Sequence, residues 1–151
     1  MELSTFLVHA KKKSYANKKA IATLLEDGSK EFKYAEGDYK YRDQYVGYNP
    51  FSGVELVWEK NKVIWTMSYY GKVFGFSDIL PSEVYAFLRK ALKQVSVESP
   101  FRGLPLFWKD ELEYHNETKG TLDYFVGIEK IVSHAQTIYQ LQYQGGMIRD
   151  K

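Results

Sequence analysis

Apolar and polar residues alternate along two neighbouring segments, residues 53–59 and 63–69. This period of two is typical of half-buried β-strands, and Lys60-Asn61 between the segments suits a two-residue turn, so we predict an antiparallel hairpin. The register that such a turn sets gives an apolar face with the pairs Trp58/Val63, Leu56/Trp65 and Val54/Met67. The opposite, more polar face has the pairs Glu59/Lys62, Val57/Ile64 and Glu55/Thr66.

Further strand candidates lie on both sides of this hairpin. Residues 39–45 also alternate, and Asn49-Pro50 marks a turn between them and the hairpin. Two shorter candidates, residues 21–25 and 31–34, come earlier in the chain. Three more follow a long loop: Leu112–Asn116, Leu122–Val132 and Thr137–Tyr143. A turn predicted at His134-Ala135 gives the last two the pairs Ile131/Ile138 and Ile128/Leu141.

Two other segments have the spacing of amphipathic helices. The first has its apolar face at Leu3, Phe6, Leu7 and Ala10, and it ends in Lys11-Lys12-Lys13, where basic side chains complement the helix dipole. The second begins at Pro81-Ser82-Glu83 and has a continuous stripe of Val84, Phe87, Leu88, Ala91, Leu92 and Val95. Residues 96–109 contain two prolines and a glycine and are predicted to form a loop.

These elements predict an α+β fold, with an antiparallel sheet of about six or more strands and two packed amphipathic helices. An offset of 74 aligns residues 51–71 with 125–145, and the identical pairs are Phe51/Phe125, Gly53/Gly127, Glu55/Glu129, Ile64/Ile138, Tyr69/Tyr143 and Gly71/Gly145. We therefore predict a single domain over residues 1–151 with two related halves, 1–76 and 77–151, each a helix followed by three strands. Two ordinary hairpins of similar composition are the alternative interpretation.

Composition narrows the class of protein. A chain of 151 residues can bury its own core, and the absence of cysteine excludes disulfides and thiolate metal sites. A net charge of +2 favours no particular partner, and the 17% aromatic content, mostly tyrosine, favours a sheet-rich fold. No apolar run approaches the length of a membrane span, and residues 3–10 are too short for a signal peptide, so we expect a cytoplasmic protein without a membrane partner.

Several short motifs resemble those of a known family. They are Phe6-Leu7, Ala10-Lys11, Gly37-Asp38-Tyr39-Lys40-Tyr41-Arg42-Asp43, Phe51-Ser52-Gly53-Val54-Glu55, Val57-Trp58, Trp65-Thr66-Met67-Ser68-Tyr69-Tyr70-Gly71 and Pro100-Phe101-Arg102-Gly103. Together they resemble a domain of unknown function found in bacteria and archaea, and the resemblance covers most of the chain. Some members of that family carry the domain behind a repressor-type helix-turn-helix region, whereas this chain starts directly with the domain. The resemblance implies a fold boundary but no activity and no catalytic residues.

Motifs for known chemistry are missing from the sequence. The three histidines have no paired spacing, and no nucleophile elbow, phosphate-binding loop or dinucleotide fingerprint occurs, so we expect no metal ion and no cofactor. An enzyme hypothesis rests on Asp43, Glu55, His115 and Glu129 converging in a cleft, where one carboxyl group has a raised pKa and acts as acid or base. The simpler interpretation is that the carboxylates lie on the polar face of the sheet.

Aromatic side chains support the leading hypothesis. Tyr39, Tyr41 and Tyr45 share one strand face, and Trp58, Trp65 and Tyr69 share another, so these rings could line a pocket for a small molecule. Packing within the core is the alternative interpretation. The candidate ligand-binding residues are Tyr39, Tyr41, Arg42, Asp43, Tyr45, Glu55, Trp58, Trp65, Tyr69, His115 and Glu129.

The function predicted from these patterns is a non-catalytic module. It would bind a ligand, act as a sensor or bind a protein partner, and a homodimer is one form that it could take. Nucleic-acid association through the lysine cluster Lys11, Lys12, Lys13, Lys18 and Lys19 is a weaker alternative, because acidic residues nearly balance basic ones over the whole chain.

Overall fold

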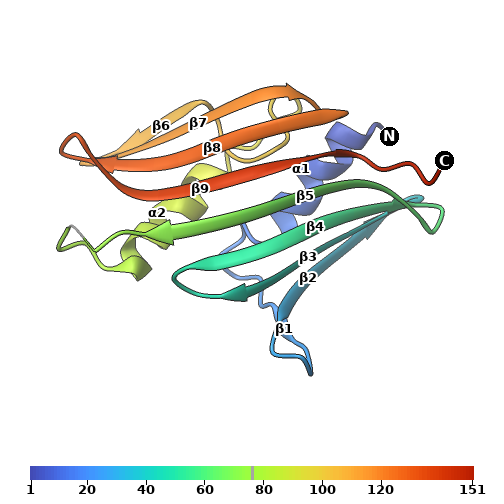
Figure 1. Ribbon diagram of the computed structural model, residues 1–151, viewed down its shortest axis with the longest axis horizontal. Helices are drawn as coiled ribbons and strands as arrows, with labels where there is room; N and C mark the ends of the chain where they lie inside the picture. The colour runs from blue at the N-terminus through green and yellow to red at the C-terminus, as the bar shows by residue number, and fades with distance from the viewer. Residues whose placement is uncertain (76) are drawn as a thin grey trace.

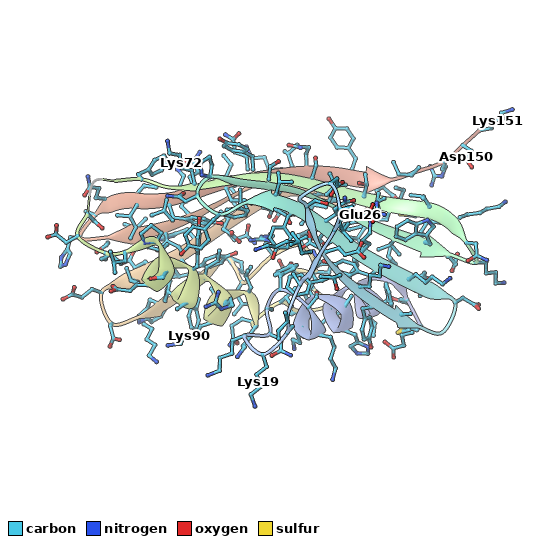
Figure 2. The ribbon with its side chains drawn as sticks, turned by 90° about the horizontal axis from the view of Figure 1, so that it is seen from below. Lys19, Glu26, Lys72, Lys90, Asp150 and Lys151 are labelled. Atoms are coloured by element: carbon cyan, nitrogen blue, oxygen red, sulfur yellow. The ribbon has the colours of Figure 1, made fainter. Side chains whose placement is uncertain are left out.

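A computed structural model of the protein describes residues 1–75 and 77–151, which form one antiparallel sheet of nine strands with two helices on one of its faces (Figure 1, Figure 2). Phe76, the last residue of the predicted first half, lies outside the described residues. The elements are α1 (Leu3–Lys13), β1 (Thr23–Leu24), β2 (Lys30–Glu36), β3 (Tyr39–Gly47), β4 (Phe51–Glu59), β5 (Lys62–Val73), α2 (Pro81–Leu92), β6 (Leu106–Lys109), β7 (Leu112–Thr121), β8 (Tyr124–Ser133) and β9 (Gln136–Met147). The predicted α+β class and antiparallel sheet are confirmed.

The strands lie in the order β1-β2-β3-β4-β5-β9-β8-β7-β6, so β1 and β6 form the two edges, and β9, the last strand in the chain, pairs with β5 in the middle. Two sequence predictions need correction at these edges. The strand predicted over residues 21–25 is only the two-residue β1, and the predicted loop 96–109 contains the strand β6. The edge strand β6 pairs with β7 between Leu106 and Lys109, and no local sequence pattern indicates this pairing.

Both predicted hairpin turns are present. Lys60 and Asn61 have φ values of 48° and 67°, and His134 and Ala135 have values of 48° and 62°, so each turn has two residues in the left-handed region, as type I′ turns require. The pairing beyond each turn differs from the prediction. The register of the β4/β5 hairpin shifts between Val57 and Trp58, and that of the β8/β9 hairpin shifts between Ile131 and Val132.

These shifts are β-bulges, and they reverse the predicted faces of β4. Trp58 lies opposite Val63 as predicted, but the next pair is Val57/Trp65, which leaves Ile64 as the extra residue. The pairs that follow are Leu56/Thr66, Glu55/Met67 and Val54/Ser68, in place of the predicted Leu56/Trp65, Glu55/Thr66 and Val54/Met67. In the second hairpin the pairs are Ile131/Tyr139 and Ile128/Gln142, in place of Ile131/Ile138 and Ile128/Leu141.

The bulges bring acidic side chains onto the buried face of the sheet. Glu55 and Glu129 are both 0% exposed, so the expectation that they lie on a polar, solvated face is wrong. Trp58 does not share a face with Trp65 and Tyr69, because it follows the register shift and lies half-buried on the opposite face. The inner face of the sheet therefore contains carboxylates among aromatic rings.

The core lies between this inner face and the two helices, which Figure 2 shows on the same side of the sheet. α1 contributes Phe6, Leu7 and Ala10, and α2 contributes a buried stripe that runs from Val84 to Leu92. The sheet contributes mainly aromatic and branched side chains, among them Tyr41, Val57, Trp65, Met67, Tyr114, Phe125, Ile131, Tyr139 and Leu141. Lys11, at the end of α1, is also fully buried in this layer.

Candidate ligand-binding pocket

Two carboxylates and a lysine meet in the core under the first half of the sheet. Asp43 on β3 and Glu55 on β4 are directly opposite each other across the strand pair, and they are 2% and 0% exposed. The Lys11 ammonium group reaches them from α1, with its Nζ atom 3.3 Å from Oε1 of Glu55, and it also donates a hydrogen bond to the backbone oxygen of Phe101. A buried cation therefore accompanies the two buried acids.

The second half of the sheet holds a matching carboxylate with more complete partners. Arg102 donates two hydrogen bonds to Glu129, from Nε at 3.0 Å and from Nη2 at 2.8 Å, in a bidentate arrangement. Tyr114 and Tyr139 donate hydrogen bonds to the same carboxylate at 2.5 and 2.8 Å. Four donated hydrogen bonds thus satisfy Glu129, although it is fully buried.

A tyrosine in each half crosses a glycine of the neighbouring strand. Tyr69 lies opposite Gly53 and Tyr143 lies opposite Gly127, and a Cβ atom on either glycine would collide with the tyrosine ring. The space above the glycine lets each hydroxyl reach a polar side chain two strands away. Tyr69 donates to Asp43 at 2.5 Å, and Tyr143 donates to Asn116 at 2.7 Å.

The two halves differ in how well their buried polar atoms are satisfied. Within the described residues, the Tyr41 hydroxyl, the Trp65 indole nitrogen and both oxygens of Glu55 are buried without a hydrogen-bond partner of good geometry. Their counterparts at an offset of 73 or 74 are Tyr114, Tyr139 and Glu129, which bond to one another. These unsatisfied groups make the first half of the sheet less stable than the second, since buried polar groups without hydrogen-bond partners cost free energy.

Burial changes the protonation of the groups in the first half. Burial and the neighbouring Glu55 raise the pKa of Asp43 from 3.8 to about 7, although the Tyr69 hydroxyl, Arg102 and Lys11 act in the opposite direction. Burial lowers the pKa of Lys11, and Glu55 partly offsets that effect. Burial and the charge of Asp43 raise the pKa of the Tyr69 phenol well above its usual value. Asp43 thus titrates near neutral pH.

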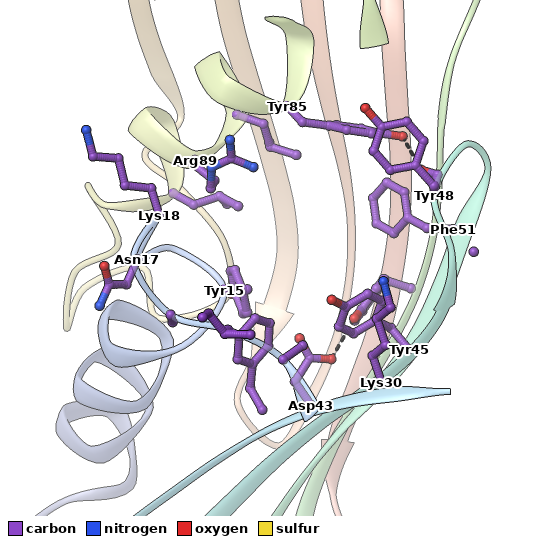
Figure 3. Close-up of a pocket in the computed structure, with 18 of the residues that line it drawn as sticks. Tyr15, Asn17, Lys18, Lys30, Asp43, Tyr45, Tyr48, Phe51, Tyr85 and Arg89 are labelled. Carbon is purple, nitrogen blue, oxygen red and sulfur yellow. Dashed lines mark hydrogen bonds between the residues drawn. The ribbon is translucent and has the colours of Figure 1, made fainter. Parts of the chain in front are cut away.

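Asp43 and Tyr69 form part of the floor of an open pocket of about 540 Å³ (Figure 3). Its walls come from the segment after α1, from the sheet and from α2. The aromatic lining residues are Tyr15, Phe32, Tyr45, Tyr48, Phe51, Tyr69 and Tyr85, and the charged ones are Lys18, Lys30, Asp43, Arg89 and Arg102. Arg102 connects the pocket with the second half, because its guanidinium group lies over the rings of Tyr15 and Tyr69 while it binds Glu129.

Rings of the pocket wall hold one another in place near α2. Tyr85 packs edge-on against Tyr48 and Phe51, with ring centroids 5.1 and 5.7 Å apart. Its hydroxyl donates a hydrogen bond of 2.5 Å to the backbone oxygen of Tyr48. Figure 3 shows these three rings at one side of the pocket, with Asp43 and Tyr45 at another and Lys18 and Arg89 across from them. The wall is thus largely formed before any ligand binds.

The residues predicted as a site are divided among four places. Asp43, Tyr45 and Tyr69 line the pocket, whereas Tyr41, Glu55, Trp65 and Glu129 belong to the buried layer next to it. Tyr39 is half-buried and stacks on Phe6 at the end of the sheet. Three others lie on the opposite face: Arg42, Trp58 and His115. The Arg42 guanidinium covers the Trp58 ring, and His115 is half-exposed beside Glu113, so the hypothesis that His115 converges with the three carboxylates is wrong.

Several residues of the site escaped the sequence analysis. Lys11 was assigned to a solvated helix end, yet it lies four residues after Leu7, on the apolar side of α1. Arg102 lies in a segment read as a loop, and nothing local signals its pairing with Glu129, 27 residues away. Tyr85 and Arg89 are at i and i+4 on α2, next to its apolar stripe, so a search for a mixed aromatic and basic flank of that helix could have found them.

Other kinds of site find no support in the described residues. No three His, Cys, Asp or Glu side chains among residues 1–75 and 77–151 are grouped in a way that could hold a metal ion. In the same ranges, neither helix combines the length and the apolar character that a membrane crossing requires. The pocket is therefore the candidate site that the described residues offer.

A family model described as a domain of unknown function, DUF5680, matches residues 43–148. The chain belongs to the DUF5680 family. The match begins at Asp43 and includes most of the pocket lining on the sheet and on α2, whereas α1 and its buried Lys11 precede the matched part of the DUF5680 domain. No curated protein and no solved structure has significant similarity to this DUF5680 chain.

Proposed function

We propose that this DUF5680 domain binds a small molecule in the pocket between β3, β4, the segment after α1, and α2. The observation that carries the proposal is the combination of a preformed aromatic wall with a buried, hydrogen-bonded carboxyl group on the floor. Pockets for small molecules typically have such a composition, with apolar walls and a few placed polar groups. The volume of about 540 Å³ is within the range of sites that hold metabolite-sized ligands.

The buried charged groups of the first half also support ligand binding. Asp43 is held beside Glu55 and an ammonium group that has lost much of its solvation, and polar residues with such perturbed environments gather at functional sites. The corresponding cluster around Glu129 has a complete set of hydrogen-bond partners. Its burial is therefore explained by these partners without a bound ligand. The contrast between the halves favours the first half as the functional one.

A thermal-shift screen with a matched pair of variants tests the proposal. A ligand that binds only the folded chain raises its melting temperature, by an amount that grows with ligand concentration above the Kd. We expect a hit whose shift is lost in Tyr85→Ala, which removes the wall ring, and kept in Tyr70→Ala, which removes an exposed ring of the opposite face. A shift that Tyr70→Ala abolishes and Tyr85→Ala leaves intact would place binding elsewhere and refute the proposal.

A second candidate function is acid–base catalysis by Asp43. The observation in its favour is a pKa of about 7 at the floor of a pocket, since a catalytic acid or base works best near the ambient pH. If a bound compound is turned over, Asp43→Asn should abolish turnover while leaving binding within a few-fold. Turnover that survives this substitution would exclude the catalytic role. A site in which Asp43 acts together with His115 is ruled out, because His115 lies on the other face of the sheet.

The internal repeat remains part of the proposal, with four strands in each half of the sheet, β2–β5 and β6–β9, in place of the predicted three. The strand order is the same from either side of the β5/β9 pair once β1 is set aside, and Tyr69 lies opposite Tyr143, its counterpart at the offset of 74 (143 − 69). Both hairpins also have their bulge at equivalent positions. These coincidences support two related units around an approximate twofold axis, of which the first acquired the pocket.

The cellular role, the partner and the location of the protein are also proposals. We keep a sensor-like role in the cytoplasm, with a protein partner or a second copy of the chain as the recipient of the signal. Nucleic-acid association through the lysine cluster is a weaker candidate, because Lys11 is buried in an ion pair and Lys18 lines the pocket.

A further inference from the structure

Three basic side chains line the pocket without an acidic partner. Lys18, Lys30 and Arg89 all contribute to its lining, and none of them forms an ion pair within 4.0 Å with a carboxylate of the described chain. They come from three separate elements, the segment after α1, β2 and α2, and Figure 3 shows Lys18 and Arg89 at one side of the pocket and Lys30 at another, beside Tyr45. Their positive charges are thus free to act on whatever occupies the space between them.

The negative charge in the pocket is small. Among the described residues that line it, Asp43 is the one acidic side chain, and its carboxyl group already accepts a hydrogen bond from Tyr69. Arg102, the fourth basic residue, is bound bidentately by Glu129. Three unpaired cations against one buried carboxyl group leave the pocket electropositive, and a concave site with walls of low dielectric strengthens that field.

The shape of the aromatic wall adds a second requirement. Tyr85 stands nearly perpendicular to both Tyr48 and Phe51, at interplanar angles of 88° and 83°, so the rings form a corner with faces in two directions. A flat ring can stack on one face of such a corner and present its edge to the other, the two arrangements that aromatic pairs prefer. The corner is less suited to a flexible aliphatic chain, which gains nothing from ring geometry.

We infer that the pocket binds an anionic aromatic compound, a flat ring system that carries a carboxylate, sulfonate or phosphate group. The rings lie in the corner of Tyr48, Phe51 and Tyr85, and the anionic group lies in the space bounded by Lys18 and Arg89 on one side and by Lys30 on another. This inference rests on the proposed function, because it assigns a chemical class to the ligand of the same pocket. A nucleotide and an aromatic acid share this chemistry.

Two fluorescent probes with the same rings test the inference. 8-Anilinonaphthalene-1-sulfonate carries a sulfonate, and N-phenyl-1-naphthylamine has the same ring system without it. Binding of each is titrated to the wild-type chain, to Lys30→Gln/Arg89→Gln and to Lys62→Gln/Lys72→Gln, which removes two charges from exposed positions of β5 outside the pocket. Tyr85→Ala serves as the variant that removes the ring corner.

We expect the sulfonate probe to bind more tightly than the neutral probe to the wild-type chain. Lys30→Gln/Arg89→Gln should weaken the sulfonate probe by about tenfold, which corresponds to about 1.4 kcal/mol, and change the neutral probe by less than about twofold. Lys62→Gln/Lys72→Gln should change neither, and Tyr85→Ala should weaken both. The affinity of the sulfonate probe should also fall as sodium chloride is raised from 0.05 to 0.5 M, because salt screens the attraction.

The outcomes that overturn the inference differ from those that overturn the proposed function. Equal affinity for the two probes, or equal weakening of the sulfonate probe by the two double variants, would refute an anionic ligand while leaving the pocket intact. Failure of either probe to respond to Tyr85→Ala, or failure of both to bind, would contradict the pocket itself. With binding established, competition of the sulfonate probe by adenosine monophosphate and by benzoate then distinguishes a nucleotide from an aromatic acid.

Discussion

Asp43 connects the buried charges of the first half to the pocket. Its carboxyl group is opposite Glu55 across the strand pair and accepts a hydrogen bond from Tyr69, while Lys11 and Arg102 act on it through the core. Two acids this close in a medium of low polarity cannot both be charged without cost, so one of them retains its proton to a higher pH. This one residue therefore makes the stability of the fold depend on pH.

We expect Asp43→Asn to stabilise the protein increasingly as pH rises from about 4 to 7. The unfolded chain loses the Asp43 proton near pH 3.8, whereas the folded chain keeps it to about pH 7. Between these values the folded state binds more protons, so raising the pH destabilises the wild-type chain, by roughly 1.4 kcal/mol per unit of pKa difference at most. The contribution is fully present below pH 3.8 and is lost as pH passes 7. Urea unfolding at five pH values measures it.

The matched control is Asp123→Asn, which changes the same functional group in an exposed turn. Its unfolding free energy should follow that of the wild-type chain across the whole pH range. A constant difference between wild type and Asp43→Asn from pH 4 to 8, or a difference that shrinks on raising the pH, would show that Asp43 is ionised throughout and refute the assignment.

At the scale of the elements, the sequence predicted what local patterns control. Both helices, both type I′ turns and most strands follow from periodicity and turn residues. The bulges could not be predicted, because a single extra residue such as Ile64 leaves the alternation on each side unchanged while exchanging the partners across the ladder. Because the prediction lacked this one extra residue, it assigned the side chains of β4 to the wrong faces. It therefore placed Glu55 in solvent, whereas the structure has it in the core.

The site was harder to predict than the elements, for a related reason. A lysine or arginine in a sequence is expected to be solvated, and its burial becomes acceptable only when the fold supplies a countercharge. Lys11 and Glu55 are on different elements, and Arg102 meets Glu129 only because the segment after α2 returns under β8. Asp43, Tyr45 and Tyr69 were named as candidates from their strands, but the pocket also needs α2 and the segment after α1.

A prediction at this scale concerns the two hairpin turns. Ala135 has φ of 62°, a conformation that costs an alanine about 1–2 kcal/mol and a glycine nothing. Glycine gives the unfolded chain more freedom, which offsets about 0.4–1 kcal/mol of this gain. Ala135→Gly should thus raise the unfolding free energy by about 0.5–1 kcal/mol, as measured by urea denaturation.

Asn61, with φ of 67° at the equivalent position of the other hairpin, is the matched control. Asparagine tolerates the left-handed region better than alanine, so Asn61→Gly should gain clearly less than Ala135→Gly. A loss of stability in Ala135→Gly, or a larger gain in Asn61→Gly, would contradict the turn conformations described above.

For the molecule as a whole, the two four-strand halves of the sheet, β2–β5 and β9–β6, each bury a glutamate, but the partners of the two carboxylates differ. Glu129 is paired with an arginine and two tyrosines, whereas the one partner of the Glu55 carboxylate among residues 1–75 and 77–151 is the Lys11 ammonium at 3.3 Å. An arginine stays charged at any accessible pH, but a buried lysine can lose its proton. The second half is therefore held by a permanent ion pair, and the first by one that is lost when Lys11 is deprotonated.

Substituting the two glutamates separately tests this difference. Glu129→Gln leaves the Arg102 charge buried without compensation and should cost about 3–5 kcal/mol. Glu55→Gln should cost less, because burial already lowers the pKa of Lys11 and removing Glu55 lowers it further, so the amine loses its proton at a lower pH than in the wild-type chain. The folded state of that variant then binds fewer protons than the unfolded chain, and its stability relative to wild type should rise between pH 7 and 9. Urea unfolding curves at pH 7 and pH 9 measure these effects, and Glu117→Gln, at an exposed position of β7, is the control. Equal losses of unfolding free energy in Glu55→Gln and Glu129→Gln, unchanged by pH, would mean that both halves depend on fixed ion pairs.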